Sequence, residues 1–187
     1  MKLNIYLFRH GAHASRKNIL CGWINLPLSK KGINDAKILA EKLSGERIDV
    51  AFCSDLLRSE QNLVEVLQYH LNAKVVIDPR LRERHFGALS GELASIFADT
   101  SALQTIDGGF VEGVPGLESM NTVRKRVFPF MSNVLRLMQE EKVNVAISAH
   151  TESVRFIQEY LEGLTPDQSE LLTNNSTEYK KYVVDFE

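Results

Sequence analysis

Short apolar segments that are typical of buried strands alternate with longer amphipathic segments along almost the whole chain. The first segment, Lys2–Phe8, is rich in β-favouring residues and is typical of a strand that packs on both faces. Four later segments are also expected to form strands: Ile48–Cys53, Lys74–Ile77, Val143–Ser148 and Tyr179–Phe186. This alternation predicts an α/β fold of three layers, in which helices cover both faces of a mostly parallel central sheet.

Amphipathic helices are expected between these strands. The first begins at Ser29, which can act as an N-cap, and ends before Ser44-Gly45. The third is long, from about Glu118 to Glu141, and Pro129 should kink it because proline cannot donate a hydrogen bond to the preceding turn. The second helix follows the Ile48–Cys53 strand, and its expected apolar stripe consists of Leu57, Leu63, Val64, Leu67 and Leu71.

Composition limits the class of protein. A chain of 187 residues, of which 44% are hydrophobic and 25% charged, suits one compact domain over residues 1–187. A net charge of −2 argues against a general nucleic-acid-binding protein. No apolar run approaches the length of a membrane span and the N-terminus lacks a signal sequence, so a cytoplasmic protein without a membrane partner is expected. Cys21 and Cys53 are expected to be free thiols.

Residues 98–117 are expected to form an irregular loop, a short insertion that could contact the substrate. The segment contains Asp107-Gly108-Gly109 and Pro115-Gly116, which favour turns. Its apolar residues are Leu103, Ile106, Phe110 and Val111. Two interpretations stay open, because these side chains could form a lid that selects the substrate or a small hydrophobic cluster of their own.

Reactive side chains follow the predicted strands at one edge of the sheet. Arg9 and His10 follow the first strand, Arg58 the second, Glu83 the third and His150 the fourth. Ligands of open α/β folds bind outside the carboxyl ends of the strands, so these side chains are expected to meet. Guanidinium groups bind phosphate, a neutral imidazole can attack phosphorus, and a protonated carboxyl can protonate a leaving alcohol. This set indicates phosphoryl transfer on a small phosphorylated substrate, with no metal or other cofactor.

The chain also resembles a known family over nearly its whole length. The similar segments are Arg9-His10-Gly11, Gly22–Gly32 (the family's "GW.D.PLS.KG"), Ser54–Gln61, Leu81–Gly87, Pro115–Ser119 and Ser148–His150. Each segment is modestly specific, but their occurrence in this order identifies the chain as a member of the histidine phosphatase superfamily. That group contains cofactor-dependent phosphoglycerate mutases and many small phosphatases. The resemblance implies the phosphoglycerate mutase-like version of the predicted fold.

The resemblance assigns a role to each residue of the reactive set. His10 matches the histidine that becomes phosphorylated, and Arg9 and Arg58 match the arginines of the phosphate pocket. His150 matches the second histidine, which contacts the transferred group, and Glu83 matches the acid that protonates the leaving oxygen. The implied mechanism has two steps: His10 takes the phosphoryl group, and water then attacks the phosphohistidine with Glu83 as the base.

The chain departs from the family pattern just after the first histidine. Many relatives continue Arg-His-Gly with Glu-Thr and a nearby Asn, whose side chains help to bind phosphate. Here Ala12–Arg16 occupies that stretch, which is one residue shorter. His13, Ser15 and Arg16 are therefore candidates for contact with phosphate or substrate, and the alternative for all three is a solvent-facing position in the loop.

Other candidates lie beside the second histidine and the glutamate. Thr151-Glu152 replaces the Gly-Gly or Gly-X of many relatives, and Thr151 is expected to cap the next helix and to offer its backbone N–H to an anion. Trp23 is either a wall of the pocket or a packing residue. Arg82 and Arg84 are expected to point away from the face that carries Glu83, and His85 to share that face as a pocket or structural residue.

Three functions are compatible with these residues. The mutases of the family are usually longer, with insertions that enclose the substrate, whereas this chain has one modest loop between Glu83 and His150. A more open site admits water, so a phosphatase is favoured over a mutase. A non-catalytic module that binds a phosphorylated ligand is disfavoured because His10, Arg58, Glu83 and His150 are all present. The sequence names neither the physiological substrate nor the oligomeric state.

Overall fold

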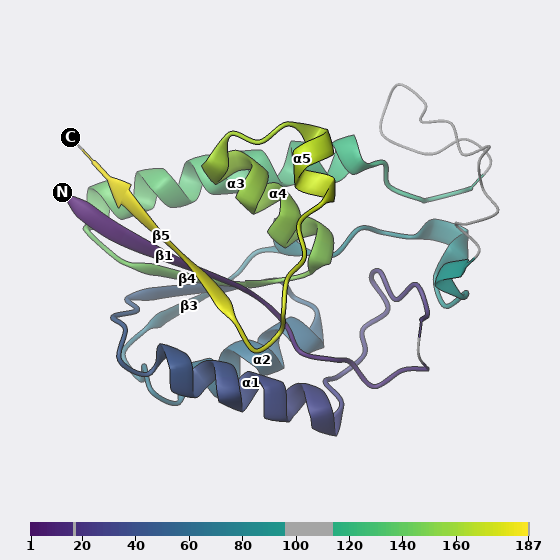
Figure 1. The fold of residues 1–187 in the computed structure, drawn as a ribbon, viewed down its shortest axis with the longest axis horizontal. Coiled ribbons are helices and arrows are strands. Elements are labelled where there is room, and N and C mark those ends of the chain that lie inside the picture. Colours follow the sequence, from purple (N-terminus) through teal and green to yellow (C-terminus); the bar gives the residue numbers. More distant parts are fainter. Residues whose placement is uncertain (17, 96–113, 187) are drawn as a thin grey trace.

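The computed structural model describes residues 1–16, 18–95 and 114–186, and five strands form its central sheet (Figure 1). The strands are β1 (Lys2–Arg9), β2 (Val50–Cys53), β3 (Lys74–Ile77), β4 (Val145–Ala149) and β5 (Tyr179–Asp185). Their order is β3-β2-β4-β1-β5, and only β5 is antiparallel to its neighbour. The predicted mostly parallel sheet is confirmed.

Helices cover both faces of this sheet. Figure 1 shows α1 (Lys30–Leu43) and α2 (Leu57–Leu67) on one side. On the other side lie α3 (Met120–Glu141), α4 (Thr151–Glu162) and the short α5 (Pro166–Glu170), which was not expected from the sequence. The α/β fold of three layers is therefore confirmed.

Alternation along β1 explains why the sheet is buried on both faces. Successive side chains of a strand point to opposite faces. Leu3, Ile5 and Leu7 accordingly join the core under α3 and α4, whereas Tyr6 and Phe8 join the core under α1 and α2. Each of these five side chains is at most 7% exposed, so packing on both faces fixes the position of β1 up to its carboxyl end, which His10 follows.

Two details of the helices differ from the sequence-based expectation. The N-cap of α4 is His150 and not Thr151, because Thr151 already has helical geometry. The stripe on α2 is narrower than predicted: Leu63 is buried, but Val64 is 62% and Leu71 87% exposed, because α2 ends at Leu67 and β3 is an uncovered edge strand. Pro129 lies inside α3, which continues through it to Glu141.

Two glycines allow the loop after β1 to pack on the first turn of α1. A Cβ on Gly11 would lie 2.4 Å from the carbonyl oxygen of Gly32, and a Cβ on Gly32 would lie 2.0 Å from that of Ala12. Gly11 does not have a positive φ, so it is required for this close approach rather than for a left-handed turn. The same contact fixes the backbone that follows His10.

We expect Gly32→Ala to lower the free energy of unfolding by about 1–3 kcal/mol, because the new methyl group must displace the Ala12 carbonyl. This sign is opposite to the gain that alanine normally brings to a helix. Gly45→Ala is the matched control, since nothing lies within 4 Å of a Cβ there, and it should change stability by no more than about 0.5 kcal/mol. Urea unfolding measures both values. Equal stabilities for the two variants would contradict the close contact.

The expected loop at 98–117 lies mostly outside the described residues, and its proposed lid residues Leu103, Ile106, Phe110 and Val111 all do. The described end of the segment, from Val114 to Leu117, contains the turn at Pro115-Gly116. Among the helices that the structure describes, none has the length and apolar character that a membrane span requires.

Candidate active site

Adjacent parallel strands bring the two histidines of the predicted set together. In the register of β1 and β4, Arg9 lies opposite Ala149, so His10 and His150 follow at neighbouring strand ends. The backbone N–H of His10 donates to the carbonyl oxygen of Ala149 at 3.1 Å. The two imidazole rings meet edge to face, with centroids 4.7 Å apart. The predicted meeting of these side chains at one sheet edge is observed.

The hydrogen bonds of His10 determine which ring nitrogen is free to react. Its Nδ1 lies 2.7 Å from the carbonyl oxygen of Gly11, and a carbonyl can only accept, so Nδ1 carries the proton. The other nitrogen, Nε2, then has a lone pair and accepts from Nε of Arg58 at 3.2 Å. Burial, followed by the charge of Arg58, holds the pKa of His10 well below its ordinary value. His10 is therefore a neutral imidazole with an unprotonated Nε2.

Arg58 brings a buried positive charge next to that nitrogen. Its side chain is only 1% exposed, and its terminal nitrogens donate to the carbonyl oxygens of Gly22 and Ile24 at 2.6 and 2.9 Å. None of its recorded hydrogen bonds within the described residues goes to a carboxylate. Nε of Arg9 is likewise buried without a hydrogen-bond partner among those residues. A buried cation without an anionic partner favours the binding of an oxyanion.

His150 is oriented by the end of β2. Ser54 accepts a hydrogen bond from the backbone of Leu56, so its own hydroxyl proton can be donated to Nε2 of His150 at 2.6 Å. The other ring nitrogen of His150, Nδ1, is buried and has no hydrogen-bond partner in the described part of the chain. Burial and then the neighbouring His10 lower the pKa of His150. His150 thus has one ring nitrogen without a hydrogen-bond partner beside His10.

Glu83 is held by the beginning of α4. Its carboxylate accepts hydrogen bonds from the backbone N–H groups of Thr151 at 3.0 Å and Glu152 at 3.1 Å. A third N–H, that of Arg84, donates to the same carboxylate at 2.9 Å. The first N–H groups of a helix have no intrahelical partner, so they are available to an anion. Thr151 therefore positions Glu83 through its backbone.

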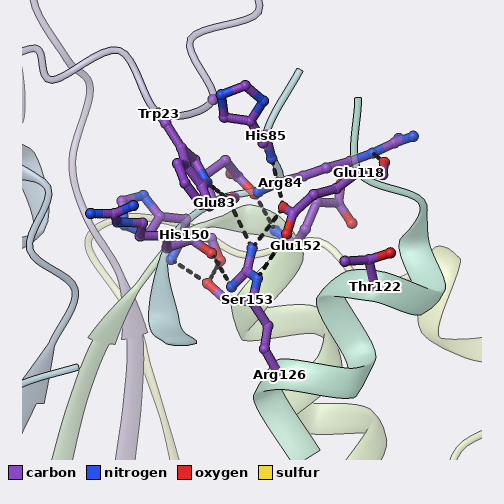
Figure 2. Close-up of polar contacts among 12 residues, drawn as sticks. Trp23, Glu83, Arg84, His85, Glu118, Thr122, Arg126, His150, Glu152 and Ser153 are labelled. Carbon is purple, nitrogen blue, oxygen red and sulfur yellow. Dashed lines mark hydrogen bonds and ion pairs between the residues drawn. The ribbon is translucent and has the colours of Figure 1, made fainter. Parts of the chain in front are cut away.

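Arg126 supports the segment around Glu83 and was not found from the sequence (Figure 2). From α3 its guanidinium donates to the carbonyl oxygens of Arg80, Arg82 and Glu83, at 2.6 to 2.9 Å. It also pairs with the carboxylate of Glu118 at 3.1 Å. Its partners are mostly backbone atoms, which leave no pattern of residue types in a sequence.

We expect Arg126→Met to lower the free energy of unfolding by about 3 kcal/mol, because it removes the guanidinium donor of the Arg80 and Arg82 carbonyls and the ion-pair partner of the buried Glu118. The matched control is Arg136→Met on the same helix, where the arginine is exposed, and a change of at most about 0.5 kcal/mol is expected. Urea titration followed by circular dichroism measures both. If Arg126→Met is as stable as the control, the scaffold role of Arg126 is wrong.

A cavity of about 210 Å³ lies over these groups. Six predicted site residues line it: Arg9, His10, His13, Arg58, Glu83 and Thr151. Its other lining residues are Ile19, Leu20, Cys21, Gly22, Phe86 and Glu152. Cations surround the histidine end, and two carboxyl groups stand at the wall formed by α4 and the segment of Glu83. The charges therefore suit a phosphate group next to a leaving oxygen that needs a proton.

The structure does not place Ser15, Arg16 and Trp23 on the wall of this cavity, and His150 is not among its lining residues. Ser15 bonds Nδ1 of His13 at 2.8 Å and so orients that ring, whereas Arg16 is exposed. Trp23 donates its indole N–H to the carbonyl oxygen of Glu83 at 2.6 Å and is a positioning residue. Because the loop after Gly11 is shortened, the sequence alone could not show which of these candidates line the cavity.

The other residues near Glu83 have structural contacts. Arg82 pairs with Asp55 and stacks over the ring of Trp23, with 4.3 Å between Cζ and the centroid. His85 contacts the edge of Trp23 and bonds the carbonyl oxygen of Gly116 at 2.7 Å, and it is not among the cavity-lining residues. The structural interpretation of His85 is therefore the one that the geometry supports.

Both cysteines are free and buried. Cys53 lies in the core under α1 and α2, where burial raises the pKa of its thiol to about 12. Cys21 lines the cavity, 3.5 Å from Nδ1 of His13, and burial raises the pKa of its thiol as well. Among the described residues, no group of three or more His, Cys, Asp or Glu side chains has the arrangement of a metal site.

The chain matches the sequence model of a known protein family. The profile of the histidine phosphatase superfamily (branch 1) matches residues 5–185. A 2,3-bisphosphoglycerate-dependent phosphoglycerate mutase of Methanosarcina mazei is 27% identical, over 87% of this chain and 82% of the relative. A phosphoglycerate mutase of Schizosaccharomyces pombe is 31% identical, over 88% of this chain and 82% of the relative.

Solved structures share the fold. A mycobacterial glucosyl-3-phosphoglycerate phosphatase superposes with a TM-score of 0.77 at 22% identity, over 97% of this chain and 90% of that one. An alpha-ribazole phosphatase from Shigella flexneri superposes with a TM-score of 0.79 at 21% identity, over 96% and 89%. The sequence match and the shared fold lead to one conclusion: the chain belongs to branch 1 of the histidine phosphatase superfamily.

Proposed function

We propose that this protein is a phosphomonoesterase that hydrolyses a small phosphorylated metabolite through a phosphohistidine on His10. The observation that carries the proposal is the tautomer of His10, whose unprotonated Nε2 faces the buried Arg58. A neutral nitrogen nucleophile beside a fixed cation is what attack on an anionic phosphate requires.

The proposed reaction has two steps. In the first, Nε2 of His10 forms a bond to phosphorus while the bond from phosphorus to the leaving oxygen breaks, and a cavity carboxyl protonates that oxygen. In the second, water attacks phosphorus and gives a proton to the carboxylate, while the N–P bond breaks and its electron pair returns to Nε2. Arg9, Arg58 and His150 would stabilise the charge on the transferred group. The resemblance to the family assigns the role of this acid to Glu83.

A mutase is the second candidate, and the names of the curated relatives favour it. The two activities differ in whether water or a second phosphorylated metabolite receives the phosphoryl group. The names of the two solved structures above support hydrolysis, since both are called phosphatases.

One assay separates these functions. The protein is incubated with glycerol phosphate, or with 3-phosphoglycerate and catalytic 2,3-bisphosphoglycerate, and both inorganic phosphate and isomerised product are measured. Release of phosphate that persists in EDTA is expected, because arginine and histidine side chains hold the phosphate charge. Isomerisation faster than phosphate release would instead identify a mutase. Neither activity towards a panel of phosphorylated metabolites would favour a non-catalytic module.

A further inference from the structure

Three buried polar residues of α2 contact the ends of the strands that lead to the two histidines. Arg58, Ser59 and Asn62 are each at most 1% exposed. Arg58 donates to Nε2 of His10, and the hydroxyl of Ser59 donates to the carbonyl oxygen of Ser148, in β4, at 2.9 Å. Arg58 has a role in the proposed reaction and Ser59 joins the helix to the sheet, whereas Asn62 has no role so far.

The side chain of Asn62 binds the backbone directly after the nucleophile. Its Oδ1 accepts a hydrogen bond from the backbone N–H of Gly11 at 3.1 Å. The carbonyl oxygen of the same Gly11 accepts from Nδ1 of His10 at 2.7 Å. Asn62 therefore holds Gly11, and Gly11 in turn holds the proton on Nδ1 of His10.

The other half of the Asn62 amide has no such contact. Its Nδ2 is buried and has no hydrogen-bond partner among the described residues. A buried donor without a partner is unfavourable, and such a group in a folded protein needs an explanation. An aliphatic side chain of similar size would avoid this penalty, but it could not accept from Gly11. The acceptor Oδ1 is therefore the feature that explains an amide at this position.

Asn62 and Arg58 act on opposite sides of the same imidazole. They are four residues apart on α2, so they lie on one face of the helix. Arg58 contacts Nε2 of His10 directly, whereas Asn62 reaches Nδ1 through Gly11. The environment of both ring nitrogens thus depends on one helix.

We propose that Asn62 is a positioning residue that fixes Gly11 and thereby keeps the imidazole of His10 aligned, with its proton on Nδ1. The inference rests on the proposed phosphatase function and concerns how the nucleophile is held for attack. Without Oδ1 of Asn62, the Gly11 backbone gains freedom and the hydrogen bond from Nδ1 weakens. Attack then slows because it requires alignment, whereas binding of phosphate by Arg9 and Arg58 changes little.

The first test observes the Nδ1 proton of His10 in the resting protein. Nuclear magnetic resonance of protein with ¹⁵N-labelled histidine reports this proton, and its absence from His10→Ala assigns the signal. Asn62→Leu should speed its exchange with water by about 10-fold or more, the equivalent of one lost hydrogen bond. Asn144→Leu is the matched control, because buried Asn144 also accepts through Oδ1 from a backbone N–H of β1, that of Asn4 at 2.9 Å. It should leave the exchange unchanged.

The second test separates alignment from binding. In single-turnover experiments with p-nitrophenyl phosphate, Asn62→Leu should slow phosphorylation of His10 by about 10-fold or more. The substrate concentration that gives half the maximal rate should change by less than about threefold. Asn62→Asp keeps the Oδ1 acceptor, so at alkaline pH it should restore slow exchange and most of the rate. Asn62→Ala introduces no larger side chain and repeats both measurements if the leucine variant does not fold.

The inference is overturned if Asn62→Leu keeps the wild-type exchange or the wild-type phosphorylation rate, or if Asn144→Leu alters the exchange equally. Failure of the proposed function has a different signature, because the wild-type protein would then form no phosphohistidine. The exchange measurement needs no substrate, so it tests the contact of Asn62 in either case.

Discussion

Replacement of His10 by alanine is expected to lower turnover of any phosphomonoester by about 10⁴-fold or more, because it removes the nucleophile. The second histidine does not present the same nitrogen, because Nε2 of His150 is engaged by Ser54. In the wild-type protein, quenching after mixing with ³²P-labelled substrate should trap a phosphoryl group that is stable in base and labile in acid. The His10→Ala protein should trap none.

His150→Ala and His13→Ala provide the matched controls for this result. Both remove an imidazole near the cavity but leave Nε2 of His10 in place, so labelled protein should still form, although more slowly for His150→Ala. Peptide mapping should find the label on His10 in both variants. Full turnover by His10→Ala, or label on a different residue, would disprove the assignment.

Arg58→Ala is expected to lower kcat/KM by about 100-fold or more, equivalent to roughly 3 kcal/mol of lost transition-state stabilisation. The reason is the position of the guanidinium, 3.2 Å from the nitrogen that forms the new bond, in a place that water hardly reaches. Arg58→Lys keeps the charge but cannot reach the Gly22 and Ile24 carbonyls and His10 together, so it should recover only part of the loss. Steady-state kinetics on p-nitrophenyl phosphate measure both variants.

The pH profile separates this electrostatic role from a loss of packing. Burial and the charge of Arg58 hold the pKa of His10 below its ordinary value, and removal of that charge raises it. His10 then becomes protonated at a higher pH, and a protonated imidazole cannot attack. The acid limb of kcat/KM should therefore move to higher pH in Arg58→Ala and stay in place in Arg58→Lys. An unchanged limb in Arg58→Ala would show that the cation does not act on His10.

The strands and the reactive set could be predicted because both depend on short local patterns. Buried parallel strands are continuous apolar runs, as in Lys2–Phe8, and their ends fix where the next polar residue lies. The meeting of His10 and His150 then follows from the topology of a parallel sheet, without knowledge of any side-chain contact.

Other features depend on contacts that no local pattern records. The exposure of Val64 and Leu71 follows from the sheet ending at β3, which only the strand order reveals. The supporting role of Arg126 depends on carbonyl groups from a distant segment. The proton affinity of Glu152 depends on burial and on Glu83, which is 69 residues away in the chain. The sequence therefore predicted the residues of the site but not the raised pKa of Glu152.

The buried guanidinium of Arg58, whose recorded hydrogen bonds within the described residues reach no carboxylate, also links ligand binding to thermal stability. An anion that enters the cavity binds the native state and not the unfolded chain, so at a fixed concentration it should raise the melting temperature more when its dissociation constant is lower. A hundredfold excess over the dissociation constant stabilises the native state by about 2.7 kcal/mol. A thermal-shift survey of phosphorylated metabolites on the inert His10→Ala protein would therefore rank candidate substrates by affinity while none of them is consumed.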